Sequence, residues 1–167
     1  EKKDIETQFY RVDSGADLVV FCSLALHDLL KDFGIECDAM VGHSTGEKTA
    51  LFASGIIRVK DRDELQHIML DYRKITRELV ASDDVPTGTI LSVGAADETT
   101  LNRLLKEYKD RIYMTLDNCP NQKILFGTDQ KDVDEITGKL KAQHAFVEPL
   151  VANHAYHTPI FIGVWYA

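Results

Sequence analysis

The first strong pattern in the chain is a run of apolar residues at helical spacing over residues 14–33. Ser14, with Asp17 three residues later, forms a capping signal at the start of this run, and Gly34 follows its end. A second run, with apolar residues at three- and four-residue steps, extends from about residue 63 to 82. The sequence therefore predicts two helices here, and one buried stripe of the second contains Leu65, Ile68, Met69, Tyr72, Ile75 and Leu79.

A different pattern begins after residue 86, where short strand-like runs alternate with helical ones. Strands are predicted at 89–95, 111–117, 123–127 and 145–150, and helices at 97–108 and 131–143. The turn residues NCPN separate the second and third strands. The resulting β-α-β-β-α-β order is that of ferredoxin-like domains, so the sequence predicts a small subdomain of this kind.

Between the two predicted helices of the first half lies the segment GHSTG, residues 42–46. A short apolar run at 39–41 predicts a strand before it, and EKTALFAS predicts a helix after it. This order is typical of a G-x-S-x-G nucleophile elbow, in which small residues are needed because side chains on either side would collide with neighbouring strands. Backbone N–H groups at the start of the helix point to the same place and can stabilise an oxyanion.

Together these patterns predict an α/β fold with a partial α/β-hydrolase-like core and an inserted ferredoxin-like small subdomain. The serine-bearing part of the core is expected at residues 1–86 and the small subdomain at 87–151. Residues 152–167 are expected to carry a histidine loop and to return to the core.

Composition narrows the range of partners. The 167 residues carry a formal net charge of -8, which disfavours binding to nucleic acid or to an anionic membrane surface. The longest apolar run is too short to span a bilayer. Three cysteines without a C-x-x-C pair fit reduced thiols. These features predict a soluble, cytoplasmic protein.

A serine hydroxyl needs a base to become a nucleophile at neutral pH, and histidine is the usual one. Of six histidines, His154 and His157 lie in NHAYHTP, just after the last predicted strand, where a side chain could return to the elbow. Their spacing could also suggest a metal site, but no third ligand stands at a suitable distance along the chain. No metal is therefore predicted.

Three segments resemble one known family. GHSTGE is similar to the GHSxGE motif of the malonyl-CoA:acyl-carrier-protein transacylase family, which includes the acyltransferase domains of polyketide and fatty acid synthases. DNCPNQKILFG resembles the N-x-P segment of that family, and HAYHTP resembles its histidine loop, close to the HAFH form associated with malonyl selectivity. The motifs occur in the same order, and the resemblance covers residues 15 to 160.

The resemblance implies roles for individual residues. Ser44 would be the nucleophile, His157 the general base and then acid, and the Thr45 N–H an oxyanion-hole donor. Arg73, at the edge of its helical stripe, falls where the family binds the free carboxylate of the extender unit, which suits the planar fork of a guanidinium. The remaining residues implied in substrate binding are His43, Asn118 and His154.

The resemblance also implies the reaction and the partners. A malonyl-type unit would move from CoA to the phosphopantetheine thiol of an acyl carrier protein through an acyl-serine, with no permanently bound cofactor. Other domains of a multidomain synthase are expected partners. The G-Q-G segment of the family does not precede Ser44, and the chain ends ten residues after His157, so an internal fragment of a longer acyltransferase domain is expected.

Two alternatives remain open at this point. A serine esterase or thioesterase shares G-x-S-x-G and would place an acid between serine and histidine, and Asp117 and Asp134 are among the acids there. A non-catalytic, truncated piece of a synthase that serves as a scaffold is the second. Arg73 separates the first alternative from the transferase, because an esterase for neutral acyl groups would not need it.

Overall fold

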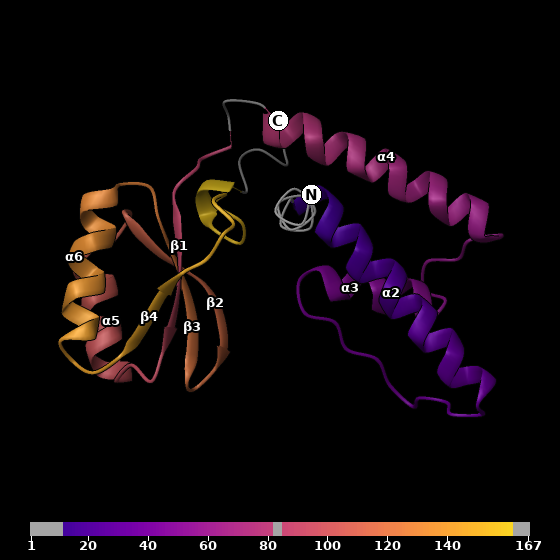
Figure 1. Cartoon of the computed structure of the whole chain (residues 1–167), viewed down its shortest axis with the longest axis horizontal. Coiled ribbons are helices and arrows are strands. Elements are labelled where there is room, and N and C mark those ends of the chain that lie inside the picture. Colours follow the sequence, from indigo (N-terminus) through magenta and orange to yellow (C-terminus); the bar gives the residue numbers. More distant parts are fainter. Residues whose placement is uncertain (1–11, 82–84, 162–167) are drawn as a thin grey trace, which may run out of the picture. The chain divides into compact units, whose positions relative to one another are not determined.

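A computed structural model describes residues 12–81 and 85–161 of the chain (Figure 1). It divides into two compact units, Glu1–Glu78 and Leu79–Ala167. Within the described residues, the first unit is helical, and the second contains a sheet with two helices.

The first unit contains α2 (Val12–Asp32), α3 (Thr45–Ala53) and most of α4 (Arg62–Ala81). The predicted end of the first helix is confirmed. Gly34 has φ 75° and donates to the carbonyl of Lys31 at 2.8 Å, while the Ile35 N–H donates to that of Leu30 at 3.0 Å. These two bonds form a Schellman motif, in which glycine is favoured because the left-handed conformation strains other residues.

Packing in the first unit is thinner than the apolar pattern predicts. Among its described residues only Asp17, Val20 and Met69 are buried. Ile68 and Ile75, predicted in the buried stripe of α4, are exposed because no sheet covers this stripe among the described elements of the unit. A cation–π contact between α3 and α4 places the ammonium of Lys48 3.3 Å from the centre of the Tyr72 ring.

The strand predicted at residues 39–41 is not formed in the described structure. A strand needs a neighbour that pairs with its N–H and C=O groups, and the described elements of the first unit are all helices. Val41 is 96% exposed, so its side chain packs against almost nothing among the described residues. The approach to Ser44 is therefore an irregular segment rather than a strand.

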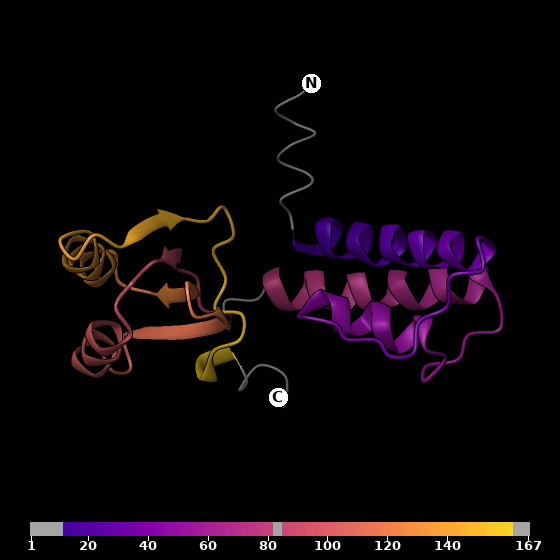
Figure 2. The same cartoon turned by 90° about the horizontal axis from the view of Figure 1, so that it is seen from below.

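The second unit contains the predicted β-α-β-β-α-β succession. Its elements are β1 (Thr89–Gly94), α5 (Glu98–Glu107), β2 (Ile112–Cys119), β3 (Gln122–Gly127), α6 (Gln130–Lys141) and β4 (Phe146–Pro149). The sheet order is β2-β3-β1-β4, and each neighbouring pair is antiparallel. Both helices cover the same face of the sheet (Figure 1, Figure 2).

Two apolar clusters lie on opposite faces of this sheet, because side chains alternate along a strand. The larger cluster, under α5 and α6, includes Leu125 and Ile136, both fully buried. The smaller one, on the other face, contains Ile90, Ile124, Phe126 and Ala155. Ala155 belongs to the segment after β4, so the open face of the sheet anchors the predicted histidine loop.

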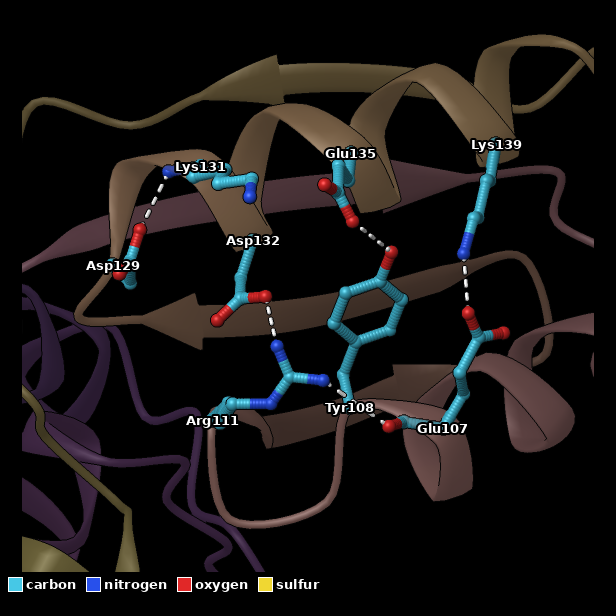
Figure 3. A network of polar contacts seen from close by, with 8 residues as sticks. All are labelled: Glu107, Tyr108, Arg111, Asp129, Lys131, Asp132, Glu135 and Lys139. Carbon is cyan, nitrogen blue, oxygen red and sulfur yellow. Dashed lines mark hydrogen bonds and ion pairs between the residues drawn. The ribbon is translucent and has the colours of Figure 1, made fainter.

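A polar network ties the end of α5 to α6 (Figure 3). Arg111 forms an ion pair with Asp132, Lys139 forms one with Glu107, and the Tyr108 hydroxyl donates to Glu135 at 3.0 Å. The hydrogen bond from Lys139 lowers the pKa of the Glu107 carboxyl, and the same bond raises the pKa of Lys139. The network fixes the two helices against each other on the face opposite to the histidine loop.

Candidate active site

Ser44 stands on a tight turn at the start of α3. Its backbone has φ 52° and ψ -118°, a positive-φ conformation that residues with a side chain rarely adopt. Two backbone hydrogen bonds close the turn: Gly46 N–H to the His43 carbonyl at 2.9 Å, and Glu47 N–H to the Ser44 carbonyl at 3.0 Å. The predicted tight turn is therefore present, and the exposed serine is held in a strained conformation.

One of the two motif glycines is required by close packing. A Cβ atom at Gly42 would lie 2.3 Å from backbone atoms of Gly46 and Glu47, whereas a Cβ atom at Gly46 meets nothing within 4 Å. The expected collision with neighbouring strands does not occur at either glycine among the described residues, because the clash at Gly42 is with the backbone of the turn itself and Gly46 has none. The turn folds back on itself before Ser44, and this produces the close approach.

The N-terminus of α3 lies directly after the serine. Thr45 is the first residue of this helix, so its N–H has no acceptor one turn earlier within the helix. The partial positive charge at a helix N-terminus favours a developing negative charge. The backbone therefore offers the kind of donor that an oxyanion beside Ser44 would use.

Arg73 is held by Asp17, for which the sequence predicted a helix-capping role. Its Nε donates to Oδ2 of Asp17 at 2.5 Å, and its Nη2 lies 2.5 Å from the same oxygen. The capping role predicted for Asp17 with Ser14 is wrong, because α2 already begins at Val12. The signal that could have revealed the pair is an acid placed within an apolar stretch of a helix.

The histidine loop is fastened to the segment that precedes β1. His154 forms an isolated bridge with Thr87, and the Gly88 N–H donates to the carbonyl of Asn153 at 2.8 Å. Beyond them the Ala155 N–H donates to the carbonyl of Pro86 at 3.1 Å. These bonds extend the pairing of the sheet into the loop, so its backbone is held within the second unit.

Within this loop, the two histidines have different surroundings. His157 is exposed and has φ 59°, a left-handed backbone conformation. His154 is half-buried, and its Nδ1 is buried with no hydrogen-bond partner among the described residues. Burial lowers the pKa of His154, so its neutral form is favoured. An edge-on contact with the Tyr156 ring, at 5.6 Å between centroids, packs it further.

Asn118 and His43 are both exposed. Asn118 lies in β2, which extends through Cys119 and narrows the predicted four-residue turn to Pro120 and Asn121. Its Nδ2 donates to Oε1 of Gln122 at 3.2 Å across this hairpin. The structure thus gives the Asn118 side chain a contact that supports the hairpin.

The predicted site residues divide between the two units. His43, Ser44, Thr45 and Arg73 belong to the first, and Asn118, His154 and His157 to the second. The structure brings His43, Ser44 and Thr45 together on one turn and the two histidines of the second unit together on one loop. Among the described residues no group of three or more metal-binding side chains occurs. None of the described helices is both long and apolar enough to cross a membrane.

Comparison with known proteins identifies the family. The profile of the acyl transferase domain matches residues 6–164. Tenellin synthetase of Beauveria bassiana strain ARSEF 2860 is 30% identical over 159 residues, which are 94% of this chain and 4% of the synthetase. The chain therefore corresponds to a small part of that relative.

Solved structures give the same result. The malonyl-CoA:ACP transacylase of Synechocystis sp. PCC 6803 has a TM-score of 0.73 at 26% identity, over 91% of this chain and 47% of that protein. A malonyl-transacylase solved with its type II polyketide synthase acyl-carrier protein has a similar fold, with a TM-score of 0.74 at 21% identity. The match covers 95% of this chain and 50% of that protein. The chain belongs to the acyl transferase domain family, whose members include polyketide synthase domains and malonyl-CoA:ACP transacylases.

Proposed function

We propose that this chain is the part of a synthase acyltransferase domain that moves a malonyl-type unit from CoA to the phosphopantetheine thiol of an acyl carrier protein. The observation that carries the proposal is the strained, exposed Ser44 at the N-terminus of α3. Family membership supports the transfer reaction. The names of the similar transacylases support malonyl as the acyl group and a carrier protein as the acceptor.

In the first half-reaction, the Ser44 hydroxyl attacks the thioester carbonyl of malonyl-CoA. His157 takes the hydroxyl proton, and the Thr45 N–H donates to the carbonyl oxygen as it becomes negative. When the tetrahedral intermediate collapses, the carbon–sulfur bond breaks and His157 gives its proton to the CoA sulfur. The product is a malonyl ester of Ser44.

The second half-reaction runs the same steps with the carrier thiol. His157 takes the thiol proton, and the sulfur attacks the ester carbonyl. The ester bond to Ser44 breaks, and the proton on His157 returns to the serine oxygen. Arg73 binds the free carboxylate throughout, and we assign His43, Asn118 and His154 to the lining of the acyl site.

We also propose a fold assignment for the parent domain. Residues 1–86 would belong to an α/β-hydrolase-like core, 87–151 would form a ferredoxin-like small subdomain, and 152–167 would return to the core. The strand order and antiparallel pairing of the second unit support the middle assignment. In this arrangement the chain works beside the other domains of a multidomain synthase, in a reducing compartment where its three exposed cysteines stay as thiols.

The direct test is mass spectrometry of the intact protein after mixing with malonyl-CoA, with acetyl-CoA in parallel. We expect a malonyl adduct that is absent in Ser44→Ala and that forms much more slowly in His157→Ala than in the wild type. The experiment should be run on this chain and on the synthase polypeptide that contains it. A folded synthase polypeptide that gains no Ser44-dependent adduct would contradict the proposal, and an adduct that water removes as fast as the carrier thiol does would favour an esterase.

A further inference from the structure

A buried carboxylate contacts the guanidinium of Arg73 in the first unit. The side chain of Asp17 is 4% exposed, and that of Arg73 is 32% exposed. Charged side chains are rarely buried unless a partner of opposite charge compensates them. Asp17 on α2 and Arg73 on α4 are therefore a matched pair: the carboxylate requires the guanidinium, which in turn cannot swing away without leaving a buried charge unpaired.

The contact uses a particular edge of the guanidinium. Nε and Nη2 both contact Oδ2 of Asp17, so the edge that these two nitrogens share is occupied. A guanidinium has five N–H donors, and the second one on Nη2 points in parallel with one on Nη1 along the far edge. That edge has the parallel geometry that grips a second carboxylate with two hydrogen bonds.

Arg73 also lines a cavity of about 740 Å³ between α2, α3 and α4. Apolar residues around this cavity include Phe21, Leu24, Phe52, Leu65 and Met69, and charged ones include Lys31, Asp61 and Arg62. A guanidinium at such a boundary is poorly hydrated on the apolar side. Its orientation therefore affects the strength of its contact with an anion more than it would on an open surface. The ion pair with Asp17 fixes the orientation of the Arg73 guanidinium.

We propose that Asp17 is a positioning residue, which holds the guanidinium of Arg73 so that its far edge faces the free carboxylate of the acyl substrate. This inference rests on the proposed function, because it assumes that Arg73 binds that carboxylate. Without Asp17, Arg73 regains its rotamers and must lose them again each time a substrate binds. An acyl group without a free carboxylate makes no contact with Arg73, so its transfer should not depend on Asp17.

The test compares malonyl-CoA with acetyl-CoA as donors for the synthase polypeptide, in wild type, Asp17→Asn, Arg73→Ala and the double variant. Asp17→Asn should raise KM for malonyl-CoA about tenfold, the usual effect of weakening one charge-assisted contact, and leave kcat and acetyl transfer nearly unchanged. The double variant should be no worse than Arg73→Ala, because both changes remove the same interaction. Asp32→Asn is the matched control, since Asp32 lies on the same helix and is exposed.

The outcomes are separable. Asp17→Asn with an unchanged or lower malonyl KM, beside a raised KM in Arg73→Ala, overturns the positioning role and leaves the proposed function intact. Equal losses with both donors also overturn it, because they indicate a structural role alone. An unchanged KM in Arg73→Ala defeats the carboxylate role of Arg73 in the proposed function itself.

A spectroscopic measurement on this chain is independent of turnover. The Nε–H proton of Arg73 should exchange slowly with water in the wild type, since it donates to a buried oxygen, and rapidly in Asp17→Asn. Circular dichroism of the same samples shows whether the variant is folded. Rapid exchange in the folded wild-type chain would overturn the proposal.

Discussion

The sharpest prediction concerns the two glycines that flank the serine turn. Gly42→Ala adds a Cβ atom 2.3 Å from backbone atoms of Gly46 and Glu47, whereas Gly46→Ala adds one that meets nothing within 4 Å. The two changes are chemically identical and lie on either side of Ser44. We expect the first to damage the turn and the second to leave it intact.

The magnitude follows from the distance. Carbon and backbone atoms prefer separations of about 3.5–4.0 Å, so the turn must open by more than an ångström to admit the new methyl group. Overpacking of this kind typically lowers the free energy of unfolding by about 1–3 kcal/mol, and a displacement of about 1 Å at a reacting atom can lower the rate about 100-fold. By contrast, Gly46 lies in α3, where alanine is favoured over glycine by about 1 kcal/mol.

The assay is the rate of malonyl loading on Ser44, followed by intact mass in a time course, together with thermal unfolding of each variant. Gly42→Ala should load at least tenfold more slowly than wild type, and Gly46→Ala should load at a rate close to it with an equal or higher midpoint. Wild-type loading by Gly42→Ala would refute the reasoning, because the turn would then tolerate the overlap without moving the nucleophile.

Three further predictions address the second unit. Burial lowers the pKa of His154, so the folded state resists its protonation; the stability is complete above about pH 6.5 and is lost as the pH falls below that value. His154→Gln should weaken this acid sensitivity in urea titrations at pH 5 and 7, and an unchanged pH dependence would contradict it. Leu125→Ala should lower the free energy of unfolding by about 2–5 kcal/mol in chemical denaturation, since Leu125 is fully buried under α5 and α6; a loss well below 1 kcal/mol would argue against this core. Lys139→Gln should raise the pKa of Glu107 measured by NMR, because it removes the hydrogen bond that lowers that pKa, and a pKa that stays depressed would show another cause.

Much of the second unit could be predicted because its signals are local. The alternation and helical spacing of apolar residues placed all four strands and both helices near their observed bounds. Gly34 likewise marked the end of α2, since a left-handed residue with its Schellman bonds needs only its immediate neighbours. The predicted turn at residues 118–121 is shorter in the structure, because the register of β2 against β3 extends β2 through Cys119.

The helices, the succession of strands along the chain, the serine turn and the family motifs could all be predicted from the sequence, because each depends on residues close together in the chain. The partner of Arg73 depends instead on the packing of helices, since Asp17 lies 56 positions away and becomes a buried anion only when α2 and α4 come together. The absence of a strand at residues 39–41 also depends on tertiary structure, because a strand needs a neighbour to pair with. The close approach that requires glycine at position 42 but not at 46 is likewise a contact between backbone atoms, which no local pattern records.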